Sequence, residues 1–158
     1  MTYFLMTLLA AAIVAADQLT KYLVVAQIPL GGRVEVLPGI VGLSYVQNHG
    51  AAFSMLQNQQ WLFALIFALF AVGIIWEFSK KRLPFTTFDR VCIVAIFAGG
   101  LGNMIDRLRL GYVVDMIATE FMDFPVFNVA DCFITCGCIV LMVHLVFFNK
   151  EFWKEEKK

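Results

Sequence analysis

The sequence predicts an all-α polytopic membrane protein: four transmembrane helices with a small extracytoplasmic β-sheet and a short interfacial helix. Of its 158 residues, 61% are hydrophobic and only 15% are charged, whereas soluble domains average about half apolar and a quarter charged. The apolar residues also fall into four blocks of roughly 20 residues, the length of helix that crosses the hydrocarbon core of a bilayer. A chain of this length is expected to form a single membrane domain, 1–158.

The first apolar block, at about residues 3–25, is expected to be a retained transmembrane helix. A secretory signal peptide carries positive charge before its apolar region, but residues 1–16 contain neither lysine nor arginine. The other three blocks are each long enough to span the membrane. They lie at about residues 61–78, 88–108 and 128–148.

Basic residues are unevenly distributed between the two sides of these helices. Eight of them lie on one side, close to the loop 79–87 or in the tail 149–158, and only three lie near helix ends on the other. Loops rich in lysine and arginine stay in the cytoplasm, so we expect this loop, this tail and both chain termini to be cytoplasmic. The extracytoplasmic segments are then those at about residues 26–60 and 111–127.

The longer extracytoplasmic segment contains two β-like stretches, Val34–Leu37 and Ile40–Val46. Proline and glycine flank and separate them, as is typical of the turns between strands, so we expect a small sheet. The segment His49–Leu56 that follows is partly apolar but shorter than a span, which predicts a short helix in the membrane interface.

Charge and cysteine content exclude two classes of function. The 12 basic and 12 acidic residues balance, so the chain lacks the basic field that nucleic-acid binding requires. The four cysteines form no CxxC pair and have no histidines at a zinc-like spacing. We therefore expect no metal site and no disulfide, and we interpret the cysteines as small packing residues. They are Cys92, Cys132, Cys136 and Cys138.

Polar residues gather near the extracytoplasmic ends of the predicted helices. An ionisable side chain at membrane depth costs at least about 2.5 kcal/mol on insertion scales, so each one needs a partner or a functional role. We expect no comparable cluster in the cytoplasmic halves. The cluster consists of Asp17, Lys21, Asn48, Asn103, Asp106, Arg107, Asp115, Asn128 and Asp131.

Several of these residues have a structural and a functional interpretation. Asp17 and Lys21 have the i, i+4 spacing of an ion pair, and we favour a structural pair over contact with a polar substrate or a lipid headgroup. Asp106 lies three residues after Asn103 on the same helix face, which favours a role in the scaffold. The fork of donors on Arg107 can hold a carbonyl, a carboxylate or a lipid phosphate.

Asp115 and Asp131 are the candidate catalytic residues. Two carboxylates in one half-buried site do not both ionise easily, so one keeps a proton and the pair can act as general acid and general base on a shared water. The serines have no histidine and acid arranged around them, and the two histidines form no HExxH motif. The pattern favours aspartic peptidase chemistry.

Two other classes of membrane protein also have polar residues within their membrane-spanning helices. Aspartates and asparagines can line the ion path of a small cation or proton transporter, but such a path needs polar groups through the whole bilayer. A purely structural membrane subunit gives no reason to keep so many costly polar groups at one depth. Both alternatives are therefore disfavoured.

Five motifs, in their order and spacing, resemble those of the bacterial lipoprotein signal peptidase family, also called type II signal peptidases. One departure is His49, where the family pattern leads us to expect a small polar residue such as threonine. The motifs are DQLTK at 17–21, NHGAAFS at 48–54, GNMIDR at 102–107, GYVVDMI at 111–117 and FNVAD at 127–131.

The resemblance implies that Asp115 and Asp131 form the catalytic pair of an aspartic endopeptidase with no metal or organic cofactor. The implied substrate is a prolipoprotein carrying a diacylglyceryl group, cleaved just before the lipidated lipobox cysteine. The implied setting is the bacterial plasma (inner) membrane, with the active site near the outer leaflet and with lipids but no nucleic acid as partners. The residues implied to bind substrate or support the site are Asn48, Asn103, Arg107, Asn128, Asp17 and Lys21.

Overall fold

The structure is a computed structural model that describes residues 2–50 and 59–154. Within these ranges four helices are long and apolar enough to cross a membrane, which confirms the four predicted spans. The helix expected at His49–Leu56 falls mostly on residues 51–58, outside the described residues. The helices are α1 (Thr2–Gln27), α2 (Gln60–Lys80), α3 (Thr87–Leu110), α4 (Val129–Phe147) and a short 3₁₀-helix, η2 (Lys150–Trp153).

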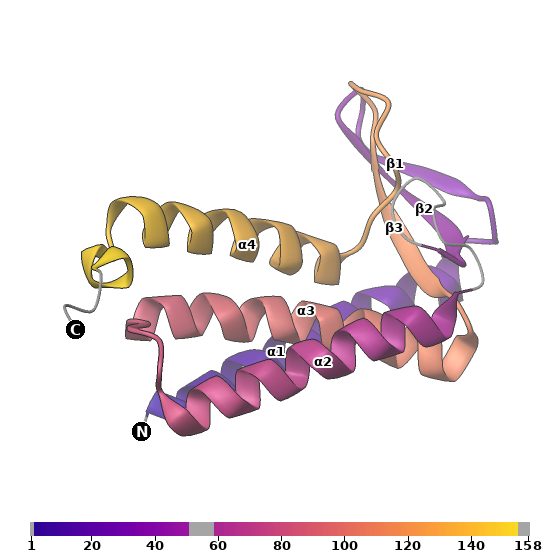
Figure 1. The fold of residues 1–158 in the computed structure, drawn as a ribbon. Coiled ribbons are helices and arrows are strands. Elements are labelled where there is room, and N and C mark those ends of the chain that lie inside the picture. Colours follow the sequence, from indigo (N-terminus) through magenta and orange to yellow (C-terminus); the bar gives the residue numbers. More distant parts are fainter. Residues whose placement is uncertain (1, 51–58, 155–158) are drawn as a thin grey trace.

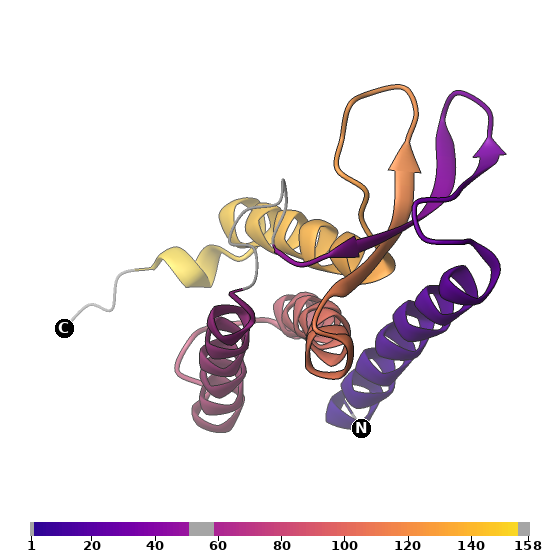
Figure 2. The same cartoon turned by 90° about the vertical axis from the view of Figure 1, so that its right-hand side faces the viewer.

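Helix α3 is the central element of the bundle. It packs against α1, α2 and α4, which surround it when the bundle is viewed end-on (Figure 2). Helices α1 and α3 end, and α2 and α4 begin, at the same end of the bundle, where the β-sheet projects (Figure 1). We call this the sheet end and the opposite one the far end.

The sheet has three antiparallel strands in the order β1-β2-β3. Two of them, β1 (Arg33–Leu37) and β2 (Val41–Asn48), confirm the predicted small sheet. The third, β3 (Val113–Thr119), lies in a segment for which the sequence predicts no strand. Residues 113–116 of β3 are all buried, so this strand lacks the apolar and polar alternation of a half-exposed strand. A short apolar run of this kind cannot be assigned by periodicity alone.

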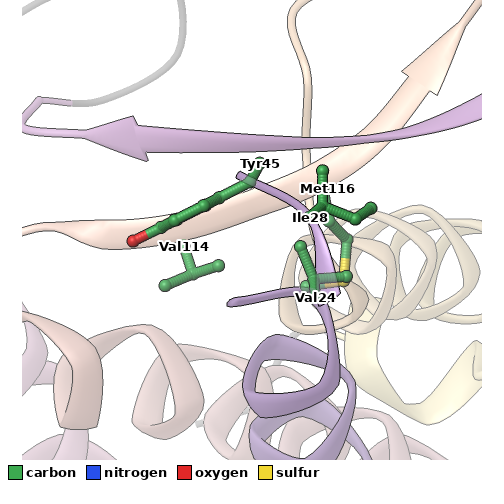
Figure 3. Packing of buried hydrophobic residues seen from close by; sticks show 5 residues of the cluster. All are labelled: Val24, Ile28, Tyr45, Val114 and Met116. Carbon is green, nitrogen blue, oxygen red and sulfur yellow. The ribbon is translucent and has the colours of Figure 1, made fainter. Parts of the chain in front are cut away.

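The last turn of α1 fixes the sheet to the bundle. Val24 and Ile28 pack against Tyr45 of β2 and against Val114 and Met116 of β3, and all five side chains are at least 93% buried (Figure 3). Asp115 lies between Val114 and Met116, two residues of this cluster. The hydrophobic contacts therefore hold its side chain at a fixed place above the helices.

Gly102 allows α1 to approach α3 closely. A Cβ atom at this position would lie 2.5 Å from Oδ2 of Asp17, a distance that real side chains do not tolerate. Small residues are common where membrane helices come into close contact, because van der Waals packing and hydrogen bonds hold such helices together. The close approach brings the polar residues of α1 beside those of α3.

A second buried polar cluster lies at the far end, so the prediction that this half lacks one was wrong. Asp89 is fully buried. It pairs with Nδ1 of His144 at 2.7 Å and accepts hydrogen bonds from Nδ2 of Asn149 and the backbone N–H of Thr86, both at 2.8 Å. Thr86 and Asp89 form a capping box at the start of α3. This cluster caps α3 and ties it to the end of α4, whose residues lie too far along the chain for spacing to reveal the contact.

Candidate active site

A buried lysine organises the polar residues at the sheet end. Nζ of Lys21 lies 2.9 Å from carboxylate oxygens of both Asp17 and Asp106 and donates to Oδ1 of Asn103, also at 2.9 Å. The i, i+4 pair predicted from the sequence is therefore present. An ammonium group has three donors, so these three acceptors satisfy it without a substrate or a lipid headgroup.

The two acidic partners of Lys21 also hold neighbouring backbone in place. Oδ1 of Asp17 accepts from the N–H of Ala130 in the first turn of α4, at 2.9 Å. Oδ2 of Asp106 accepts from the N–H of Val114 in β3, at 3.1 Å. The cluster thus positions both segments that carry the candidate catalytic aspartates, in agreement with a scaffold role for Asp106.

Two asparagines connect this cluster to the aspartates. Because Lys21 can only donate, it must face the oxygen of the Asn103 amide, so Nδ2 of Asn103 is directed at Asp131 and donates to it at 2.7 Å. Nδ2 of Asn128 donates to Oδ1 of Asp115 at 2.7 Å and to the oxygen of Asn103 at 3.1 Å. Asn128 therefore bridges the two halves of the site.

Asp131 has a second, structural role as part of a capping box. Oδ1 of Asn128 accepts from the N–H of Asp131 at 2.9 Å, and Oδ2 of Asp131 accepts from the N–H of Asn128 at 3.1 Å. Reciprocal bonds of this kind satisfy free N–H groups at a helix start. The same contacts fix the orientation of the Asn128 amide and of the Asp131 carboxylate.

Asp115 is buried in β3, and its carboxylate also accepts from Nδ2 of Asn48 at 2.9 Å. Burial raises the pKa of this carboxyl to about 6, and the charge of Asp131 acts in the same direction. The hydrogen bonds from Asn48 and Asn128 oppose this effect because they stabilise the ionised form. Asp115 thus holds its proton at a higher pH than an ordinary aspartate.

The raised pKa predicts that Asp115 makes the fold less stable as the pH rises. An unfolded aspartate has a pKa of about 3.9, so between about pH 4 and the folded-state pKa of about 6 the folded protein keeps a proton that the unfolded chain has lost. The contribution of Asp115 to the unfolding free energy is therefore largest below pH 4 and falls by about 3 kcal/mol by pH 7. Thermal unfolding of wild type and Asp115→Asn at pH 4 to 7 should show the variant gaining relative stability with rising pH; a constant difference would contradict this.

A cavity of about 1140 Å³ lies in front of the two aspartates. It is bounded by α2, α3 and α4 and by β2, β3 and the loop before α4. Three of the sequence-predicted residues lie behind its wall rather than on it, namely Asp17, Lys21 and Asn128. Those that line it are Asn48, Asn103, Arg107, Asp115 and Asp131.

Arg107 is held at the cavity by three contacts. Its Nη2 donates to the carbonyl of Gly50 at 3.0 Å and its Nη1 to the carbonyl of Asn103 at 3.4 Å. Its guanidinium lies over the ring of Phe63, 4.4 Å from the centroid. Nε is buried and has no hydrogen-bond partner among the described residues.

Comparison with known proteins decides the family. A family model described as signal peptidase (SPase) II matches residues 9–147, most of the chain. The chain belongs to the signal peptidase II family.

Relatives and a solved structure agree with this assignment. The chain is 45% identical over 156 residues to the lipoprotein signal peptidase of Streptococcus agalactiae serotype V, covering 99% of this chain and 96% of that one. It is 46% identical over 144 residues to the enzyme of the same description from Streptococcus pyogenes serotype M2, covering 91% and 90%. A solved bacterial membrane enzyme superposes with a TM-score of 0.84 at 34% identity, covering 97% of this chain and 93% of the other.

Some residues of the candidate site in this signal peptidase II family member could not be found from the sequence. Nε2 of Gln18 donates to Asp17, Asp106 and the carbonyl of Gly102, at 2.9 to 3.2 Å, and only its place beside Asp17 hints at this. Phe63 looks like any other apolar residue of a span. Within residues 2–50 and 59–154, no group of three or more histidine, cysteine or acidic side chains is placed to hold a metal ion.

Proposed function

We propose that this chain is an intramembrane aspartic endopeptidase that removes the signal peptide from diacylglyceryl-modified prolipoproteins. The cut is made just before the lipidated cysteine of the lipobox. Membership of the signal peptidase II family supports the substrate class, as do the relatives described as lipoprotein signal peptidases. Asp115 and Asp131 form the catalytic pair in this proposal.

The observation that carries the proposal is the presence of both carboxylates on one cavity inside a network of amide donors. Each of their four oxygens accepts one hydrogen bond from an asparagine side chain or backbone. The carboxylates are therefore oriented before substrate arrives, as general acid and base groups must be. One aspartate, ionised, removes a proton from a water; the other, protonated, donates to the scissile carbonyl oxygen.

The tetrahedral intermediate then collapses with the two roles exchanged. The aspartate that took the proton from water gives it to the leaving nitrogen. Arg107 assists by binding substrate through its guanidinium, which lies at the cavity, because a carbonyl held there keeps the scissile bond in place for attack. Asn48 contributes by fixing the Asp115 carboxylate.

The proposed setting is the bacterial plasma membrane, with both termini in the cytoplasm and the active site near the outer leaflet. Lysine and arginine at the far end support this orientation, among them Lys80, Lys81 and Arg82. The cavity has α2 and α4 as walls, so a substrate anchored in the same leaflet reaches the aspartates by lateral diffusion.

The test is cleavage of a synthetic lipobox peptide by the detergent-solubilised protein. The diacylglyceryl-modified peptide should be cut before its cysteine, as read by mass spectrometry, and a chelator should leave the rate unchanged. The unmodified peptide should be a much poorer substrate. Absence of cleavage, together with ion flux through the protein in proteoliposomes, would instead favour the transporter hypothesis.

A further inference from the structure

The cavity continues from the two aspartates into the membrane-spanning part of the bundle. Arg107 and Ile96 both line it from α3 and are about 16 Å apart along the helix at 1.5 Å per residue. That distance is about half of a hydrocarbon core of about 30 Å. We call this membrane-embedded part the apolar groove; it is lined by Phe63, Phe67, Phe70, Ile96 and Gly100.

Within the apolar groove, the ring of Phe67 packs against the backbone of Gly100, which has no side chain. A Cβ atom at Gly100 would lie 3.1 and 3.2 Å from two carbons of this ring, closer than van der Waals contact allows without movement. The ring also stacks on Phe97, with centroids 5.3 Å apart and an interplanar angle of 21°. Phe67 is therefore held against α3, and the missing side chain at Gly100 gives it the room to lie there.

We infer that Phe67, seated on Gly100, is a specificity-determining residue that sets how large a side chain the apolar groove accepts from the substrate. The inference rests on the proposed function, in which the apolar segment of a signal peptide lies in this groove. An apolar wall discriminates by size, and one methylene typically changes kcat/KM by about 10- to 200-fold. A ring in contact with α3 leaves the groove wider than a ring held farther from this helix.

Two substitutions change the groove in opposite directions. Phe67→Ala removes the ring and widens the groove, whereas Gly100→Ala shifts the ring slightly away from α3 and narrows the groove. The probes are diacylglyceryl-modified lipobox peptides that carry either alanine or tryptophan at one position of the apolar segment, tested position by position. At the position facing Phe67, the ratio of kcat/KM for tryptophan over alanine should rise about tenfold in Phe67→Ala. In Gly100→Ala the same ratio should fall, by a smaller factor, because the ring moves only slightly.

Matched controls separate size selection from general damage to the helices. A Cβ at Gly73 of α2 meets nothing within 4 Å, so Gly73→Ala tests the effect of the same substitution in open space. Leu69→Ala shortens an α2 side chain that is 65% exposed and does not line the cavity. Neither control should change the ratio of kcat/KM for the tryptophan peptide over the alanine peptide.

A double variant shows whether Gly100→Ala changes the kcat/KM ratio by displacing the ring of Phe67. In Phe67→Ala/Gly100→Ala the ring that would be displaced is absent, so the second substitution should no longer narrow the groove. Phe67→Leu replaces the alanine variant if that one does not fold, and thermal unfolding checks each protein.

The inference is overturned if folded Phe67 and Gly100 variants cleave both peptides with the wild-type ratio at every position. It is also overturned if Gly100→Ala has its full effect in the double variant. Failure of the proposed function looks different, because then the wild type itself cleaves neither peptide.

Discussion

Asp115→Asn and Asp131→Asn are each expected to lower kcat by about a thousandfold or more. General acid and base groups contribute about 10² to 10⁴ in rate, and an asparagine at either position can neither take a proton from water nor give one to the leaving nitrogen. The two variants should be almost as impaired singly as together, because the pair acts as a unit in the proposed mechanism. Single-turnover cleavage of the diacylglyceryl-modified peptide measures the chemical step.

Asp123→Asn is the matched control for these variants. Asp123 is exposed in the loop between β3 and α4 and does not line the cavity, so its replacement should leave kcat unchanged. Near wild-type cleavage by folded Asp115→Asn or Asp131→Asn would show that the carboxyl group is not catalytic. A strictly additive loss in the double variant would contradict the shared mechanism.

The sequence predicted those parts of the fold that depend on local composition. Four apolar blocks of the right length predict four membrane-spanning helices without knowledge of the contacts between those helices. Length and hydrophobicity suffice because the lipid bilayer itself surrounds such helices. The strand β3 could not be predicted because its residues 113–116 are buried on both faces. They therefore lack the alternation of exposed and buried positions that identifies a half-exposed strand. Its partner strand, β2, lies about 70 positions earlier along the chain.

The sequence predicts which residues belong to the candidate site but not which of them form hydrogen bonds with one another. Polar residues at membrane depth are costly enough to stand out, so both aspartates and their asparagines could be listed from sequence and resemblance. Asn128 bridges Asp115 and Asn103 by two hydrogen bonds. These bonds depend on how α3, β3 and α4 pack against one another in the folded protein. Distances along the chain carry no such information.

The far-end cluster shows the limit of counting polar residues. Thr86 and Asp89 carry a capping-box spacing that could have been noted, but the burial of Asp89 depends on His144 and Asn149, which arrive from the end of α4. Its hydrogen bonds are those of a helix cap. A polar cluster at each end of the bundle therefore does not by itself indicate a path for ions.

Lys21→Met is expected to destabilise the fold by about 3 to 5 kcal/mol. The methionine has nearly the same length but no charge, so Asp17 and Asp106, which are at least 97% buried, would lose the cation they share. Breaking a buried ion pair by removing one partner typically costs this much, because an uncompensated charge remains. Thermal or denaturant unfolding in detergent measures the change, and Lys154→Met, which removes the exposed partner of Glu151, should have little effect.

A charge-balanced variant separates the role of Lys21 in stability from its role in orienting Asn103. Lys21→Met/Asp17→Asn/Asp106→Asn leaves no unpaired buried charge and should regain part of the stability that Lys21→Met loses, since that loss comes chiefly from the uncompensated charge. It should cleave substrate more slowly than wild type, because only the hydrogen bond from Asn128 then keeps the Asn103 amide oriented with its Nδ2 toward Asp131. Full activity in this variant would mean that Asp131 is oriented without Lys21, by its capping box and by the Asn103 amide that Asn128 holds. Full stability of Lys21→Met would mean that the buried charges of Asp17 and Asp106 are compensated elsewhere.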